Sequence, residues 1–158
     1  MSGVDRAAEA PAVVRSAAPN DVAGIAAVER EVFGDPWSRA AFVALIDRPG
    51  VSFLVCEVTG SLAGYAVTYH AADEAELANL AVVPAFRRQR VGLRLLDAIM
   101  DVSREAGVRN IWLEVRASNT GGQALYRGYG FAEVGIRKRY YDRPVEDAIV
   151  MRRHTTRR

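Results

Sequence analysis

Cysteine and histidine are scarce in this chain of 158 residues. Cys56 is the only cysteine, so no internal disulfide can form, which is typical of proteins from reducing compartments. His70 and His154 are the only histidines, and no cysteine or histidine spacing typical of a metal site is present. We therefore expect no metal. Because Cys56 lies in the apolar run 51–56, we expect it to be a buried core residue.

Long apolar runs are also absent. No stretch approaches the roughly 20 apolar residues that a membrane-spanning helix needs. The first twelve residues lack the apolar core of a signal peptide. The length and the ordinary mixture of apolar and charged residues favour one cytoplasmic domain with a real core. We predict a disordered leader at residues 1–12 and a single domain at residues 13–151.

Positive charge is concentrated at the C-terminal end. The net charge is +2, and residues 152–158 contain four arginines and no acidic residue. Without them, 17 basic residues (21 − 4) face 19 acidic residues, which leaves a net charge of −2. We therefore predict a nearly neutral body and a basic, disordered tail at residues 152–158. We expect no membrane binding and no specific binding of nucleic acid.

Hydrophobic periodicity predicts a mixed α/β protein. The spacing changes from helical to alternating and back, and the predicted order is one strand, two helices, three strands, one helix, one strand, one helix and two strands. This order indicates a mixed sheet with helices on both faces. The clearest strands are expected at residues 51–58, 62–69, 74–83, 110–116 and 148–151.

The stretch from Leu77 to Leu96 reads as a strand, a basic loop and a helix. Pro84 ends the strand because it has no backbone N–H group for the ladder. Arg87, Arg88 and Arg90 then precede an amphipathic helix. Free N–H groups and the positive dipole end of a helix favour a phosphate, and arginine adds charge and a planar set of donors. The stretch therefore predicts a pyrophosphate site.

This loop resembles the acetyl-CoA-binding motif of the GNAT superfamily of N-acetyltransferases, which is Gln/Arg-x-x-Gly-x-Gly/Ala after a strand. Residues 87–92 follow the motif with one departure, because Arg90 stands at the place of the first glycine. A backbone N–H group remains there, but a positive φ angle would be strained for arginine. On the short motif alone, a solvated basic loop before an ordinary helix explains the residues equally well.

Glu114 and Tyr126 are the candidate catalytic residues. Glu114 lies within the apolar strand 110–116, where a buried carboxylate is costly unless it is hydrogen-bonded. From the residues alone, an outward-pointing carboxylate paired with an arginine is the simpler explanation. Tyr126 lies on the following helix, where an aromatic residue is often part of the core, and Tyr129 is a second candidate for that packing role.

Several blocks along the chain resemble one GNAT subgroup, the bacterial ribosomal-protein-alanine N-acetyltransferases (RimI). They follow that subgroup's order and lie at residues 33–38, 79–82, 112–119, 139–141 and 146–151. The resemblance covers about residues 13–151. It implies the GNAT fold, in which a mixed sheet splits between the strand that ends near Val83 and the strand 110–116. The pantetheine arm of acetyl-CoA would lie in the split.

The same resemblance implies a role for individual residues. Glu114 would be the general base and Tyr126 the general acid beside the departing CoA sulfur. Trp37, Tyr140 and Tyr141 would either wall a peptide groove or cover the edge of the core. Acetyl-CoA would be held by Leu80, Ala81, Val82, Arg87, Arg88, Gln89, Arg90, Val91, Gly92, Leu93 and Asn119.

One feature puts the position of Tyr126 in question. Gly121 and Gly122 stand in the first turn of its helix, where the subgroup has alanine-rich sequence. Each glycine weakens a helix by about 1 kcal/mol relative to alanine.

These roles imply an acetyl-CoA-dependent N-acetyltransferase whose acceptor amine attacks the thioester directly. The implied acceptor is the N-terminal alanine of the eighteenth protein of the small ribosomal subunit, and the basic tail would be available for contact with the ribosome. One alternative is a broader enzyme for lysine or small amines. Another is a non-catalytic module that binds acetyl-CoA or the ribosome, although the presence of Glu114 and Tyr126 argues against it.

Overall fold

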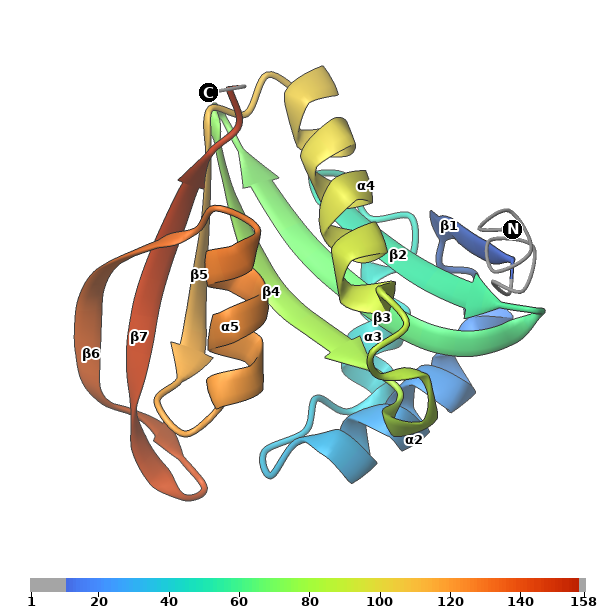
Figure 1. Ribbon diagram of the computed structural model, residues 1–158. Helices are drawn as coiled ribbons and strands as arrows, with labels where there is room; N and C mark the ends of the chain where they lie inside the picture. The colour runs from blue at the N-terminus through green and yellow to red at the C-terminus, as the bar shows by residue number, and fades with distance from the viewer. Residues whose placement is uncertain (1–10, 157–158) are drawn as a thin grey trace, which may run out of the picture.

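One seven-stranded mixed sheet forms the centre of the molecule, and helices cover both of its faces (Figure 1). The computed structural model describes residues 11–156. Its strands are β1 (Ala12–Ser16), β2 (Val51–Val58), β3 (Ser61–Ala71), β4 (Glu74–Val82), β5 (Asn110–Arg116), β6 (Ala132–Asp142) and β7 (Val145–His154). Its helices are α2 (Val22–Val32), α3 (Arg39–Leu45), α4 (Val91–Glu105) and α5 (Thr120–Gly128), with 3-10 turns η1 (Pro19–Asp21) and η2 (Pro84–Phe86). The predicted class and order of elements are confirmed.

The strands lie in the order β1-β2-β3-β4-β5-β7-β6. Only the β4–β5 pair is parallel, and all other neighbouring pairs are antiparallel. The parallel pair follows from the connection through α4, because strands joined by a crossover helix run in the same direction.

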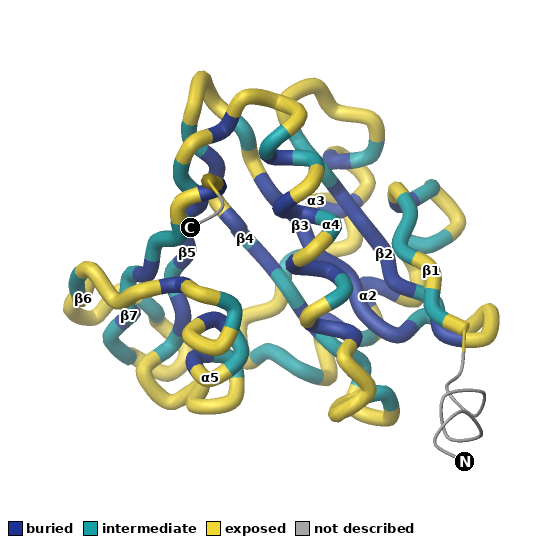
Figure 2. Tube along the Cα trace, turned by 45° about the horizontal axis from the view of Figure 1, so that its top comes forward, coloured by how far each residue is buried: buried dark blue, intermediate teal, exposed yellow. Residues whose placement is uncertain are grey.

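Two hydrophobic clusters hold the helices to the sheet. One lies under α4 and α5, and the other lies under α2 and α3. The central strands are largely buried, whereas β6 is mostly exposed at the edge of the sheet (Figure 2). The Cys56 side chain is fully buried, as predicted. The apolar side chains that α4 buries recur at helical spacing and are Val91, Leu95, Leu96, Ile99 and Met100.

The sheet splits between β4 and β5, as the resemblance predicted. These strands pair only where residues 74–77 face residues 110–113. In the ladder with β3 the register shifts after Leu77, so Ala78 has no partner in that ladder and Asn79 pairs next, with Val67. Such a bulge bends a strand and increases its twist. Residues 78–82 and 114–116 therefore diverge, and the edge of β4 that faces the split has no strand beside it.

The C-terminal strand is longer than predicted, and the boundary expected at Met151 is wrong. β7 extends to His154, which pairs with Asn110 of β5. The Thr155 side chain is buried, and its Oγ1 donates a hydrogen bond to the Val108 carbonyl at 2.6 Å. The backbone of residues 152–154 thus completes the ladder on β5, which a count of charges along the chain does not reveal.

The arginines at the start of the expected tail belong to the folded domain. The Arg153 Nε donates to the carbonyl of Tyr129 at 2.7 Å, and the Arg152 guanidinium lies 5.3 Å from the centre of the Trp112 ring. Residues 157 and 158 of the expected tail lie outside the described residues, and so do residues 1–10 of the expected leader. The structure gives no support to a tail that contacts the ribosome.

Within residues 11–156, no helix is long and apolar enough to cross a membrane. The same part of the chain has no cluster of three or more histidine, cysteine or acidic side chains that could hold a metal ion.

Candidate active site

The edge of β4 beyond the bulge offers backbone groups to a ligand. Leu80, Ala81 and Val82 pair with β3 on one side only. On the side of the split, their N–H and C=O groups face no strand of the described chain. An open strand edge is suited to an extended chain that carries amide groups. The geometry is compatible with the predicted pantetheine contacts at these three residues, which stay predictions.

The start of α4 fits the phosphate groups of a CoA molecule. No side chain within the described part of the chain caps the helix, so the N–H groups of Val91, Gly92 and Leu93 lack the partner that a capping residue would supply. Arg87, Arg88, Gln89 and Arg90 are all exposed in the loop before it. The helix dipole and these guanidinium groups together favour a bound anion.

Arg90 adopts the strained conformation that its position predicted. Its φ angle is 63° and its ψ angle is 19°, which places it in the left-handed region. The left-handed conformation costs an L-residue roughly 1–2 kcal/mol, and glycine avoids this cost. Arg90 therefore holds a conformation that glycine would adopt without strain.

Asn119 caps α5 and explains one glycine of the unusual pair. Its Oδ1 accepts a hydrogen bond from the N–H of Gly122 at 2.9 Å. A Cβ atom at position 122 would lie only 2.6 Å from the Asn119 Nδ2, so a larger residue there would require the Asn119 side chain to shift. Nothing lies within 4 Å of a Cβ at Gly121, and the structure gives no reason for that glycine. Contact between Asn119 and the cofactor stays a prediction.

Tyr126 is the buried tyrosine of α5, with 8% of its surface exposed. Its ring lies edge-on to Phe131, with 5.8 Å between the centroids. Burial, with a smaller contribution from Tyr141, raises the pKa of Tyr126 well above its usual range. The Tyr129 hydroxyl instead donates to the Asp97 carboxylate of α4 at 2.7 Å. Tyr129 thus links the C-terminal end of α5 to α4, whereas Tyr126 belongs to the buried core under these helices. A chemical role for Tyr126 stays a prediction.

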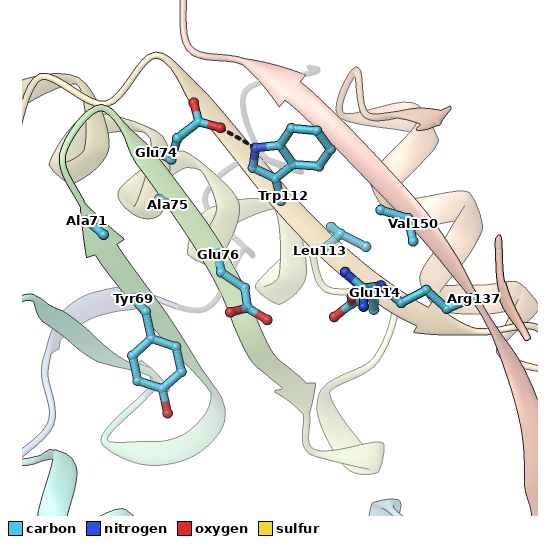
Figure 3. Close-up of a pocket in the computed structure, with 10 residues that line it drawn as sticks. All are labelled: Tyr69, Ala71, Glu74, Ala75, Glu76, Trp112, Leu113, Glu114, Arg137 and Val150. Atoms are coloured by element: carbon cyan, nitrogen blue, oxygen red, sulfur yellow. Dashed lines mark hydrogen bonds and ion pairs between the residues drawn. The ribbon is translucent and has the colours of Figure 1, made fainter. Parts of the chain in front are cut away.

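A pocket of about 390 Å³ lies beside the split and contains three glutamates (Figure 3). Glu74 and Glu76 come from β4, and Glu114 comes from β5. Their side chains share one face of the sheet because residues at alternate positions along a strand point the same way. The other lining residues are Tyr69, Ala71, Ala75, Trp112, Leu113, Arg137 and Val150.

The three carboxylates have different partners. Glu74 accepts hydrogen bonds from the Trp112 Nε1 at 2.6 Å and the Asn110 Nδ2 at 2.9 Å, and these bonds lower its pKa. Glu114 Oε2 forms an ion pair with the Arg137 Nε at 2.7 Å, and the Glu114 side chain is 14% exposed. Its engagement with an arginine agrees with the simpler explanation of this carboxylate, yet the pair lies inside the pocket.

Glu76 lies between the other two and has no ion pair within the described residues. Figure 3 shows its carboxylate directed into the space between β4 and β5. Burial and the negative charge of Glu114 raise the pKa of Glu76. The pocket therefore carries negative charge that a cationic acceptor would offset.

The aromatic candidates separate into two groups. Tyr140 and Tyr141 stack edge-to-face on β6 with 5.0 Å between their centroids. Burial and the charge of Glu114 raise the pKa of both, that of Tyr141 to about 12, so both lie within the electric field of the pocket. Trp37 instead packs on Phe42 of the core at 5.6 Å and does not line the pocket.

The sequence analysis missed Glu76 and Arg137. The alternation of Glu74 and Glu76 in a predicted strand could have indicated a second inward carboxylate, because both must share a face. Arg137 had no comparable signal. Its contact with Glu114 depends on the strand order β5-β7-β6, in which Arg137 of β6 reaches across β7 to β5.

The sequence and the fold match known acetyltransferases. Residues 22–131 match the sequence profile of the Acetyltransferase (GNAT) family. The chain belongs to the GNAT acetyltransferase family. It is 40% identical over 128 residues to the [ribosomal protein bS18]-alanine N-acetyltransferase of Escherichia coli (strain K12). The aligned region covers 78% of this chain and 84% of that protein.

Solved structures of GNAT acetyltransferases agree with this assignment. The crystal structure of the ribosomal-protein-S18-alanine N-acetyltransferase from Escherichia coli superposes with a TM-score of 0.84 at 33% identity, over 94% of this chain and 96% of that chain. The crystal structure of Ard1 from Thermoplasma volcanium superposes with a TM-score of 0.85 at 28% identity, over 92% of this chain and 99% of that chain. GNAT acetyltransferases use acetyl-CoA. The contacts of the strand edge and of the α4 start with acetyl-CoA stay predictions.

Glycine at position 90 should stabilise this acetyltransferase. We expect Arg90→Gly to raise the free energy of unfolding by about 0.5–1 kcal/mol, because the left-handed strain of arginine is removed. Arg87→Gly is the matched control, since Arg87 has a φ angle of −64° and glycine relieves nothing there. Urea denaturation of both variants measures the difference. Equal stabilities of the two variants would show that Arg90 is not strained.

The stability of Glu76→Gln should depend on pH. A carboxyl group whose pKa is raised in the fold binds its proton more tightly there than in the unfolded chain. The wild-type protein therefore loses stability as pH rises from near 4.5, the ordinary value for glutamate. We expect Glu76→Gln to gain stability relative to the wild type between pH 4 and pH 7, as measured by urea unfolding.

Glu74→Gln provides a control of opposite sign. The pKa of Glu74 is lowered by its two hydrogen bonds, so its contribution to stability is present above its ordinary pKa and is lost as pH falls. Glu74→Gln should therefore be less stable than the wild type at pH 7, and the difference should shrink at low pH. The same pH trend for both variants would contradict the assigned environments.

Proposed function

We propose that this GNAT acetyltransferase transfers the acetyl group of acetyl-CoA to a protein N-terminal amine, and that its acceptor is the N-terminal alanine of ribosomal protein bS18. The observation that carries the chemistry is the position of Glu114, which lies in an anionic pocket beside the strand edge suited to pantetheine. The choice of acceptor is supported by the 40% identity to the Escherichia coli enzyme, which is named for that reaction.

The pocket residues suit direct transfer. Acetyl-CoA supplies an activated acetyl thioester. Glu114 accepts a proton from the acceptor ammonium, directly or through water, so that the nitrogen lone pair can attack the thioester carbon. The carbon–sulfur bond then breaks, the nitrogen releases its second proton to water, and Tyr126 donates a hydrogen bond or a proton to the departing sulfur. No covalent acyl-enzyme is required.

The pKa of Tyr126 favours hydrogen bonding over full proton transfer. The ordinary pKa of a tyrosine, near 10, is already higher than that of a thiol, near 8.5. Proton transfer from tyrosine to the thiolate is therefore uphill by about 2 kcal/mol. Burial raises the pKa of Tyr126 further. Tyr126 thus acts as a neutral donor that stabilises the thiolate, and solvent supplies the proton later.

Direct transfer also suits an α-amine better than a lysine. An α-amine titrates near 8 and a lysine near 10.4, so the neutral nucleophile forms more readily at an N-terminus. The broader lysine or small-amine activity is therefore not favoured, and neither is a non-catalytic module. We propose that the enzyme acts in the cytoplasm, since the relatives are named for a ribosomal substrate.

Peptides that differ only in their first residue test the acceptor. We expect mass spectrometry to find acetylation of the α-amine of a peptide with the bS18 N-terminal sequence, with kcat/KM lower for other first residues. A peptide with a blocked N-terminus and one internal lysine is the control. Comparable kcat/KM on that control would contradict an N-terminal acceptor.

Replacing Glu114 or Tyr126 tests the mechanism. Glu114→Gln should lower kcat by about a hundredfold to ten-thousandfold, the usual range for a general base, while acetyl-CoA binding changes little. Higher pH should partly restore its rate, because the neutral amine then forms without help. Tyr126→Phe should also be slow, but higher pH should not restore it. If Glu114→Gln keeps the wild-type kcat across the pH range, Glu114 is a structural carboxylate.

A further inference from the structure

A further carboxylate, that of Glu29 of α2, is buried and does not line the pocket. Only 1% of its surface is exposed, and no arginine or lysine of the described residues pairs with it. A buried carboxylate is costly unless several donors satisfy it. Glu29 is satisfied by neutral donors, so its place in the core calls for a reason beyond packing.

The donors to Glu29 come from three separate segments. The Tyr65 hydroxyl of β3 donates to Oε1 at 2.6 Å. The Asn79 Nδ2 of β4 lies 3.0 Å from Oε1 and 3.2 Å from Oε2. The backbone N–H of Trp37, in the loop between α2 and α3, donates to Oε2 at 3.0 Å. One carboxylate thus connects two strands and a loop.

The bond to Asn79 reaches the cofactor strand at a critical point. Asn79 directly follows the bulged residue Ala78 and directly precedes Leu80, where the open edge begins. An unpaired strand edge tends to seek a partner. Anchoring the Asn79 side chain therefore helps to hold β4 apart from β5, so that residues 80–82 remain available to acetyl-CoA.

The bond to Trp37 reaches the acceptor side. The loop that contains Trp37 lies close to the turn between β6 and β7. At Gly34 the two segments are so close that an added Cβ atom would lie 3.0 Å from the Arg143 carbonyl oxygen. Arg116 of β5 donates to the Pro144 carbonyl of the same turn at 3.2 Å. This turn follows Tyr140, whose ring centre lies 5.6 Å from the guanidinium of Arg137, the ion-pair partner of Glu114. Fixing the loop therefore fixes one border of the acceptor site.

We propose that Glu29 is a positioning residue that holds the cofactor strand and the acceptor loop in a single arrangement. Its carboxylate touches neither substrate and acts through Asn79 and Trp37. The acceptor part of this inference rests on the proposed function, whereas the acetyl-CoA part does not.

Glu29→Gln is the most direct test. An amide has one acceptor oxygen where the carboxylate has two, so it cannot accept from Trp37 on one side and from Tyr65 and Asn79 on the other. We expect acetyl-CoA binding, measured by isothermal titration calorimetry, to weaken about tenfold, as the loss of a hydrogen bond to a charged group implies. Amides of residues 33–38 should exchange hydrogen faster, and the peptide KM should rise more than kcat falls.

Ile25→Val is the matched control, because Ile25 is fully buried one turn earlier on the same helix and makes no bond to either segment. It should lower the melting temperature yet leave acetyl-CoA affinity and loop exchange unchanged. Should Glu29→Gln fail to fold, Asn79→Ala removes only the strand bond. It should weaken acetyl-CoA binding and leave loop exchange as in the wild type.

Wild-type acetyl-CoA affinity in folded Glu29→Gln, or in Asn79→Ala if the former does not fold, would overturn the proposal. An equal loss of affinity in Ile25→Val would also overturn it, because general destabilisation would then explain the effect. If affinity and exchange change as expected while the wild-type enzyme acetylates no alanine peptide, the role of Glu29 stands and the proposed acceptor fails.

Discussion

The early end of one parallel strand pair determines the layout of this acetyltransferase. β4 and β5 pair over residues 74–77 and 110–113 and then diverge after the bulge at Ala78. The divergence has two consequences on opposite sides of the sheet. It frees the backbone edge of residues 80–82 near the start of α4, and it opens the pocket that Glu76 and Glu114 line on the other face. A sheet with full pairing would have neither.

The charges around the split divide into a cationic and an anionic region. The exposed arginines at positions 87, 88 and 90 precede the uncapped helix. The phosphates of a CoA molecule would gain the most electrostatic stabilisation there. The carboxylates lie in the pocket, where a positively charged amine would gain most. Arg137 neutralises part of that charge through Glu114, so the acceptor amine and Arg137 compete for the same carboxylate. In the proposed function, this separation of charge would let the two substrates approach one reaction centre from different sides.

Local signals in the sequence were sufficient for most of the fold. The change from helical to alternating periodicity, the break at Pro84 and the turn glycines predicted the element order that the structure shows. The same signals failed at the C-terminus. The charge of Arg152 and Arg153 suggests solvated residues, whereas their backbone pairs with β5 in the sheet. A strand that is completed by a distant partner leaves little trace in its own composition.

The candidate site was predictable only in part. Glu114 could be selected because a carboxylate inside an apolar strand is unusual, and the resemblance supplied its role. Glu76 left a signal in its alternation with Glu74, but the pairing of Glu114 with Arg137 depends on the order of strands in the sheet. The contacts of Glu29 join residues 8, 36 and 50 positions away along the chain, which no local pattern encodes.

The central claim is that the split brings both substrates to one centre. The most direct measurement is a crystal structure of the full chain with a bisubstrate compound that joins CoA to an alanine-starting peptide. The account predicts pantetheine amides bonded to the backbone of residues 80–82, a sulfur within hydrogen-bond distance of the Tyr126 hydroxyl, and the peptide nitrogen beside Glu114. A compound bound outside the split, or a sulfur beyond the reach of Tyr126, would contradict it.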